Sequence, residues 1–184
     1  MNLRFSVIAT FILLAAATRL VPHAWNFAPM GAMALFGAAH LEQKRYAFIL
    51  PLLAVWLSDL FLNNVVYSQY YPTFTWFGEG VLYLYGAYAL IALTGTQLFK
   101  KAVNLPLVLG GALSASAIFF VVSNLGCWVG SSMYSQDMLG LVACYAAGLP
   151  FVGGTIAGDL LFSGLLFGGF ALAQSRFPTL RLAA

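Results

Sequence analysis

Residues 80–101 of this chain read GVLYLYGAYALIALTGTQLFKK, and this stretch decides the class of fold. Its first twenty residues carry no charged side chain, and two lysines, Lys100 and Lys101, follow them directly. A helix needs about 20 apolar residues to cross the hydrocarbon core of a membrane. The stretch therefore predicts a transmembrane helix over residues 80–99 that ends in positive charge.

The composition of the whole chain agrees with this prediction. Of the 184 residues, 62% are hydrophobic and 7% are charged, and the mean hydropathy is +0.90. Soluble domains carry roughly 25% charged residues, so this chain has too few charges to cover a water-facing surface. We expect an integral membrane protein that forms a single domain.

Six apolar segments predict an all-α membrane protein, a compact bundle of six transmembrane helices. They cover residues 5–21, 27–41, 46–62, 80–99, 105–122 and 149–173. The first also resembles a signal peptide, but we expect it to be retained as a helix. The second is short, so we expect a thinned membrane edge or burial within the bundle, with Asn26 as its N-cap. Residues 138–147 form either an interfacial or re-entrant piece or an outward extension of the last helix.

The basic residues divide unequally between the two sides of this map. Alternating spans place seven of the eight together, and these are Arg4, Lys44, Arg45, Lys100, Lys101, Arg176 and Arg181. Only Arg19 lies on the opposite side. Because positive loop charge is held in the cytoplasm during insertion, the division predicts that both termini are cytoplasmic. Topology accounts for the basic residues, so we expect the lipid bilayer, and no nucleic acid, as a partner.

The acidic residues have the opposite distribution. Asp59, Glu79, Asp137 and Asp159 lie on or toward the outer half, and Glu42 is cytoplasmic. Asp59 and Asp159 lie about 13 and about 10 residues into their spans, well below the outer surface at roughly 1.5 Å per residue. An ionisable group within a span costs roughly 2.5–3.5 kcal/mol and normally faces the bundle interior or a wet cavity. Two interpretations stay open: one shared ligand cavity, or structural pairing of either acid with Arg19.

Hydrogen-bonding and aromatic residues gather at the same end as these acids. A mostly apolar cavity with a few convergent polar groups is the usual form of a small-molecule site. The candidate solute-binding residues are Arg19, Asn26, Asp59, Asn63, Tyr71, Asn124, Trp128 and Asp159. Tyr71 and Trp128 are candidates for stacking or lid residues, although an interfacial aromatic belt explains such side chains equally well. With four acids and one arginine on this side, a neutral or amine-bearing solute is favoured.

The chain lacks the common sequence motifs of nucleotide-binding proteins and hydrolytic enzymes. The patterns G-x-x-x-x-G-K-[ST], H-E-x-x-H and G-x-S-x-G are absent from the sequence, which argues against P-loop, zinc-protease and hydrolase chemistry. We expect no enzymatic activity, no catalytic residue, no metal and no cofactor. Cys127 and Cys144 are too few for a disulfide framework. We expect two small buried thiols, with a disulfide between them as the alternative.

The last span is rich in glycine. Gly154 and Gly158, and then Gly164 and Gly168, match the small-xxx-small spacing that lets helices approach closely. Ordinary helix packing within the bundle is the interpretation that we favour. A partner interface on these glycines would instead indicate a membrane assembly or scaffold protein without a solute.

Several blocks of the sequence resemble an uncharacterised bacterial family of small membrane proteins regarded as transport proteins. The longest block is NFAPMGAMALFG at residues 26–37. The others are Pro51-Leu52 with Ser58-Asp59, Phe119-Phe120 followed by Ser123-Asn124, and Leu149-Pro150-Phe151 ahead of Gly158-Asp159. These blocks cover most of the chain in order.

That family is in turn similar to the substrate-binding S components of energy-coupling factor (ECF) vitamin transporters. The resemblance implies six helices, cytoplasmic termini, a bacterial cytoplasmic (inner) membrane, and uptake of a vitamin-like solute through a pocket open to the outside. Many S components dock on an ECF energising module through an A-x-x-x-A pattern in the first helix. Here Ala9 is followed at that spacing by Leu13, and Ala15 by Arg19. The resemblance thus leaves open both an ECF energising module as partner and a protein that acts alone.

Overall fold

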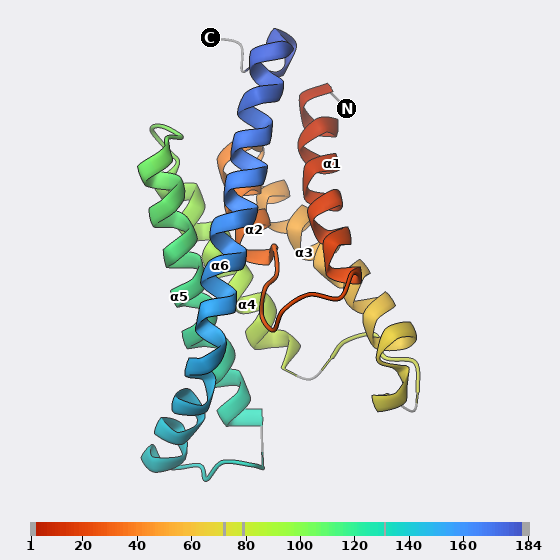
Figure 1. Cartoon of the computed structure of the whole chain (residues 1–184), viewed down its shortest axis with the longest axis vertical. Helices are drawn as coiled ribbons and strands as arrows, with labels where there is room; N and C mark the ends of the chain where they lie inside the picture. Colours follow the sequence, from red (N-terminus) through yellow and green to blue (C-terminus); the bar gives the residue numbers. More distant parts are fainter. Residues whose placement is uncertain (1–2, 72, 79, 131, 182–184) are drawn as a thin grey trace.

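The computed structural model describes residues 3–71, 73–78, 80–130 and 132–181, and every regular element in them is helical (Figure 1). The six main helices are α1 (Leu3–Ala17), α2 (Met30–His40), α3 (Lys44–Phe61), α4 (Val81–Leu98), α5 (Leu105–Gly130) and α6 (Met138–Arg176). Four short turns join or follow them: η1 (Thr18–Leu20), the π-helical turn η2 (Leu62–Val66), η3 (Ser68–Tyr70) and η4 (Pro178–Leu180). The all-α prediction is confirmed for these residues.

Five of the helical segments are long and apolar enough to cross a membrane. They are Leu3–Leu20, Lys44–Val66, Val81–Leu98, Leu105–Gly130 and Met138–Arg176. These helices indicate a multi-pass membrane protein. The helix at the second predicted span, α2, has 11 residues and is therefore about 16 Å long, roughly half the thickness of the hydrocarbon core.

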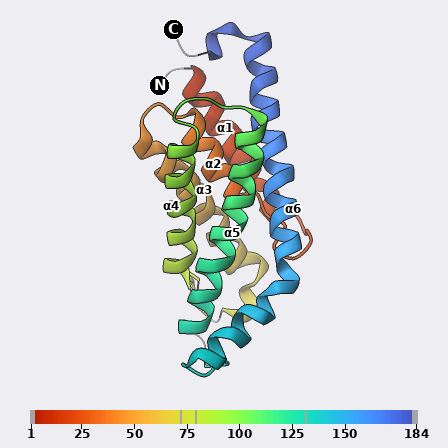
Figure 2. The same cartoon turned by 90° about the vertical axis from the view of Figure 1, so that its left-hand side faces the viewer.

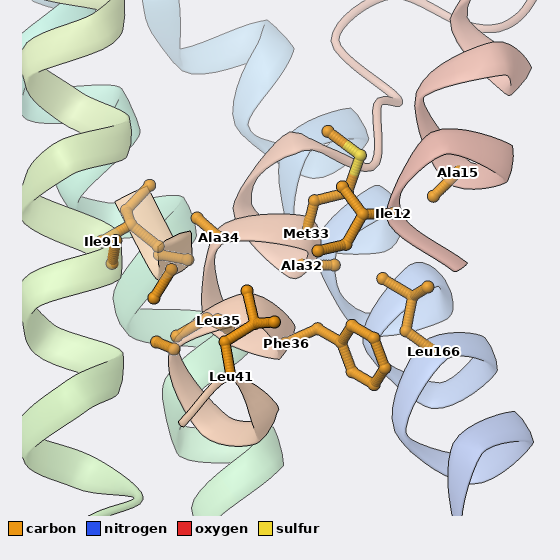
Figure 3. Packing of buried hydrophobic residues seen from close by; sticks show 14 of the residues in the cluster. Ile12, Ala15, Ala32, Met33, Ala34, Leu35, Phe36, Leu41, Ile91 and Leu166 are labelled. Atoms are coloured by element: carbon orange, nitrogen blue, oxygen red, sulfur yellow. The ribbon is translucent and has the colours of Figure 1, made fainter. Parts of the chain in front are cut away.

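The short helix α2 lies at the centre of the bundle. It contacts all five other helices, and its residues from Gly31 to Ala38 are all buried. Figure 3 shows the packing: Leu35 and Phe36 of α2 lie between Ile91 of α4 and Leu166 of α6. A helix that is apolar all round is stable only when it is enclosed. Of the two outcomes predicted for a short second span, burial within the bundle is the one observed.

Two predicted boundaries change in the structure. Helix α5 continues to Gly130 instead of ending near residue 122. Helix α6 begins at Met138 and runs through Pro150 without a break, so residues 138–147 extend the last helix and are not re-entrant. A proline inside a transmembrane helix is tolerated because neighbouring groups can satisfy the backbone carbonyl that it leaves free.

Both chain termini lie at one end of the molecule, together with the α2–α3 and α4–α5 connections (Figures 1 and 2). The helix ends that carry seven of the eight basic residues therefore meet there. Arg4 joins three of the elements, since its guanidinium donates hydrogen bonds to the carbonyl oxygens of Leu180 at 2.6 Å and His40 at 3.0 Å. Lys44 donates to the carbonyl of Ala38 at 3.1 Å. Two cations thus satisfy carbonyl groups at the C-terminus of α2, where the helix dipole favours positive charge.

Candidate functional site

The first turn of α2 lies in the half of the bundle away from the chain termini, and its backbone N–H groups determine which polar side chains are needed there. Because α2 is too short to reach both membrane surfaces, its first backbone N–H groups need partners within the protein. The predicted N-cap, Asn26, does not supply one. Helix α2 starts at Met30, Pro29 occupies the N-cap position without a side-chain bond, and Asn26 adopts a left-handed conformation with φ of 57°. The N-cap prediction is therefore wrong.

Asp159 of α6 takes over the capping role. Its carboxylate accepts hydrogen bonds from the backbone N–H groups of Gly31 and Ala32 and from the Ser116 hydroxyl of α5 at 2.7 Å. A Cβ on residue 31 would collide with this carboxylate, so glycine permits the approach. Asp159 is 3% exposed, and it joins α2, α5 and α6 at one point.

Asp59, the other acid within a span, pairs with Arg19. Its Oδ1 lies 2.7 Å from an arginine Nη, with the two side chains 18% and 11% exposed. The same guanidinium donates to the Ser58 hydroxyl and, at 3.2 Å, to the carbonyl of Val55. Each of the two interpretations therefore holds for one acid. Asp59 forms the structural pair with Arg19, and Asp159 faces a cavity.

This cavity, which we call the Asp159 cavity, has a volume of about 220 Å³. It is bounded by η1, the loop before α2, the first turn of α2, and the facing sides of α4, α5 and α6. Its lining residues are Arg19, His23, Asn26, Ala28, Met30, Gly31, Leu62, Tyr67, Tyr88, Phe119, Thr155 and Asp159. It holds three of the predicted solute-binding residues.

Among the lining residues, Tyr88 is notable for a buried hydroxyl that lacks a hydrogen bond to any described residue. Its side chain is 3% exposed, yet its hydroxyl has no hydrogen-bond partner among the residues that the structure describes. A buried polar group without a partner is costly and normally has a ligand or water to satisfy it. The ring of Tyr88 stacks on Phe119, with centroids 5.8 Å apart and planes 14° from parallel, so a flat apolar wall lies beside the free hydroxyl.

A second cavity of about 250 Å³ adjoins the first, and we call it the Asn124 cavity. The two share Asn26, Phe119 and Thr155 in their linings. Asn124 donates to the carbonyl of Phe120 at 2.7 Å and fills the space beside Gly148, where a Cβ would collide with its side chain. This cavity brings a fourth predicted residue, Asn124, into the same region.

The four other predicted site residues line neither cavity. Asn63 and Tyr71 lie near Gly78 in the α3–α4 connection. Trp128 donates its indole N–H to the carbonyl of Ser135 at 2.9 Å and so holds the α5–α6 connection. Asp59 also stands outside the linings, behind Arg19. Glu79, expected among the outer acids, lies outside the described residues.

Within the described part of the chain, the four glycines of α6 with small-xxx-small spacing do not pack against a neighbouring helix in the way that was expected. Gly154 and Gly158 receive the backbone of the loop before α2, with the would-be Cβ of Gly158 2.8 Å from the amide nitrogen of Ala28. Gly164 and Gly168 have open space beside them. The loop before α2, which lines the Asp159 cavity, is therefore seated on Gly154 and Gly158, and none of the described residues lies within 4 Å of the would-be Cβ of Gly164 or Gly168.

The cysteines are both free thiols, but only Cys144 is buried. Cys127 is exposed, so the expectation of two buried thiols is wrong for that residue.

Sequence reasoning missed Tyr88, Ser116 and Thr155. The sequence offered one indication of such residues, a hydroxyl in the middle of an apolar span. A hydroxyl there has few hydrogen-bond partners, so it can mark a polar site. Serine and threonine give this signal weakly, since they often bond to a carbonyl of their own helix, as Ser116 does to Ala112 at 3.2 Å. Tyrosine is the stronger signal, because its hydroxyl lies too far from its own backbone.

Comparison with known proteins identifies a family without assigning an activity. No curated protein and no solved structure matches the chain. The profile of one sequence family matches residues 1–180. The chain therefore belongs to that family, which is described as a family of unknown function, DUF6580.

Proposed function

We propose that the protein is a membrane transport protein that binds a small amine-bearing, vitamin-like solute in the joined Asp159 and Asn124 cavities. One observation carries this proposal: Tyr88, whose buried hydroxyl has no hydrogen-bond partner among the described residues, lines a cavity that also contains a buried carboxylate. A hydroxyl and a carboxylate that converge on a partly apolar space are the usual polar elements of a small-molecule site.

The balance of charge favours an amine. Arg19 is neutralised by Asp59 at 2.7 Å, whereas Asp159 forms no salt bridge within the described ranges. The α2 N-terminus offsets only about half an elementary charge at most. A carboxylate has about four acceptor positions, and three hydrogen bonds to Asp159 leave room for one more donor. An ammonium group supplies both that donor and the missing positive charge.

The size and shape of the cavities favour a small solute with a flat part. Small-molecule sites usually measure roughly 300–1,000 Å³, and the two cavities reach this range only together. The stacked rings of Tyr88 and Phe119 offer a flat face to an unsaturated ring, and aromatic contact of this kind is worth roughly 0.5–1.5 kcal/mol.

Uptake of the S-component type fits this arrangement. The basic residues favour a cytoplasmic location for the end that holds both termini, in a bacterial inner membrane, so the cavities would face outward. The loop at residues 22–29 would then act as the cover, because it rests on the glycines of α6 through backbone contacts. An ECF energising module is the proposed partner for the inward step. Since the A-x-x-x-A pattern is missing from α1, action without that module is the alternative.

Native mass spectrometry of gently purified protein tests the proposal by detecting a retained small molecule. We expect the wild type to retain one, and Tyr88→Phe to lower its occupancy about fivefold, as for the loss of one hydrogen bond of about 1 kcal/mol. Tyr83→Phe is the matched control, because Tyr83 lies on the same helix and lines neither of the two cavities. Protein that is empty in every gentle preparation, or equal loss in both variants, would contradict the proposal.

One observation favours a second candidate, a membrane scaffold protein without a solute. Gly164 and Gly168 lie one turn apart on α6 and have nothing within 4 Å of their would-be Cβ positions, which suits a partner helix. Co-purification of a stoichiometric membrane protein that is lost on Gly164→Leu, with no retained small molecule, would support this candidate instead.

A further inference from the structure

The only two cysteines of the chain meet on neighbouring helices. Cys127 lies near the end of α5, and Cys144 lies in the second turn of α6. The Cys144 thiol donates to the carbonyl of Asn124 at 3.4 Å, which places its sulfur against the turn of α5 that leads to Cys127. Cys127 lies one turn beyond Asn124 and lines the same cavity as Asn124 and Gly148 of α6.

The two helices are held close together at this level by further contacts. The Tyr145 hydroxyl donates to the carbonyl of Val121 at 2.6 Å. Gly148 leaves space that the Asn124 side chain fills. A disulfide needs Cα atoms about 4.4–6.8 Å apart and side chains that point toward each other. The close packing of α5 and α6 around Asn124 brings the two cysteines onto facing turns, as such a bond requires.

The two thiols differ in accessibility. Cys127 is exposed and lines the Asn124 cavity, and it also lines a larger hollow of about 580 Å³ between α4 and α5. Cys144 is 2% exposed. Cys127 is therefore the accessible thiol and Cys144 the shielded one, so we expect Cys127 to react first and Cys144 second in a thiol–disulfide exchange.

We propose that Cys127 and Cys144 form a thiol–disulfide pair that cross-links α5 to α6 beside the Asn124 cavity. The co-reactant is a disulfide, either a small molecule or the active site of an oxidoreductase. The Cys127 thiolate attacks one of its sulfurs, forms a mixed disulfide and releases one thiolate. The Cys144 thiolate then attacks the Cys127 sulfur and releases the second thiolate. The protein loses two protons and two electrons, and the co-reactant is reduced to two thiols.

The bond would fix the wall of the Asn124 cavity. It closes the short segment between residues 127 and 144, which contains the α5–α6 connection. Oxidation would therefore restrict separation of the two helices at the mouth of the cavities. Exposure of this end to an oxidising compartment rests on the orientation given under the proposed function, whereas the reactivity of the pair does not.

Exchange with oxidised glutathione tests the chemistry on the purified full-length protein. After denaturation and alkylation with N-ethylmaleimide, the untreated wild type should carry two adducts. The oxidised wild type should carry none and should be lighter than the reduced chain by two hydrogen atoms. Cys144→Ser should stop at a glutathione adduct on Cys127, and Cys127→Ser should react far more slowly. A wild type that keeps two alkylatable thiols, or that accumulates the glutathione adduct, overturns the proposal.

A second measurement separates this proposal from the orientation. Intact cells expressing Cys144→Ser are treated with a membrane-impermeant maleimide, and we expect Cys127 to be labelled from outside. If Cys127 is labelled only after the cells are broken, the outward orientation fails, and with it both the uptake proposal and oxidation in the outer compartment. The glutathione reaction would still report whether the two sulfurs can form the bond.

Discussion

The carboxylate of Asp159 occupies the space where a side chain on Gly31 would begin. This relationship lets a residue of the last helix cap the first turn of the shortest one. It explains how a helix of 11 residues begins within the bundle with the N–H groups of Gly31 and Ala32 satisfied.

The first prediction concerns Gly31. Gly31→Ala places a Cβ against the Asp159 carboxylate, so we expect a loss of about 1–3 kcal/mol from overpacking. The measurement is the midpoint of thermal unfolding in detergent, followed by tryptophan fluorescence. Gly164→Ala is the matched control, because open space surrounds that glycine and alanine is about 0.5–1 kcal/mol better than glycine in a helix. Equal effects of the two changes would contradict the assigned contact.

The second prediction concerns the acceptor itself. Asp159→Ala leaves the Ser116 hydroxyl and the N–H groups of Gly31 and Ala32 without their acceptor, at about 1–3 kcal/mol for each buried group that stays unsatisfied. Asp159→Asn keeps one acceptor oxygen, so we expect a smaller loss. The same unfolding measurement should rank wild type above Asn and Asn above Ala. An asparagine variant as unstable as the alanine variant would show that charge, and not hydrogen bonding, dominates at this site.

The third prediction concerns the ion pair of Arg19 and Asp59. Removing one partner of a largely buried pair leaves the other charge uncompensated, which typically costs about 3–5 kcal/mol. Arg19→Met and Asp59→Leu should each destabilise strongly, and the double variant should lie closer to the wild type than either single one. A double-mutant cycle gives the coupling energy. Additive losses would mean that the 2.7 Å contact contributes little.

The fourth prediction concerns pH and the start of α6. Hydrogen bonds from the N–H of Gly140 and then from the hydroxyl of Ser135 hold the pKa of Asp137 below its ordinary value of 3.8. A carboxyl group whose pKa is lowered by folding stabilises the protein above its unfolded-state pKa, and this contribution is lost as the pH falls through the folded-state pKa. The difference in unfolding midpoint between wild type and Asp137→Ala should thus be constant near neutral pH and shrink below pH 3.8. A difference that grows in acid would have the wrong sign.

The class of fold followed from the sequence because apolar length is a local property. The run before Lys100 predicts its helix without reference to any other part of the chain, and α4 covers that run. Burial of α2 was one of two expected outcomes, because a short span fits either a thinned membrane edge or the interior of the bundle. The extension of α6 to Met138 could only be offered as one of two alternatives, because Pro150 resembles a helix start as much as an interior residue of a membrane helix.

The candidate site was less predictable because its contacts join distant parts of the chain. Asn26 matches the local pattern of an N-cap, but Asp159 from another helix provides the acceptor. Arg19 and Asp59 could be proposed as partners because charges within spans are few. Tyr88 could not be assigned from its position alone, since only the packing around it shows that its hydroxyl has no partner among the described residues.

The capping of α2 by α6 has a consequence for the order of assembly. During synthesis three helices separate α2 from α6, so the first N–H groups of α2 lack Asp159 until the last helix enters the bundle. The central helix is therefore completed by the final one, and a chain cut before residue 159 would lack the acceptor that closes its own core.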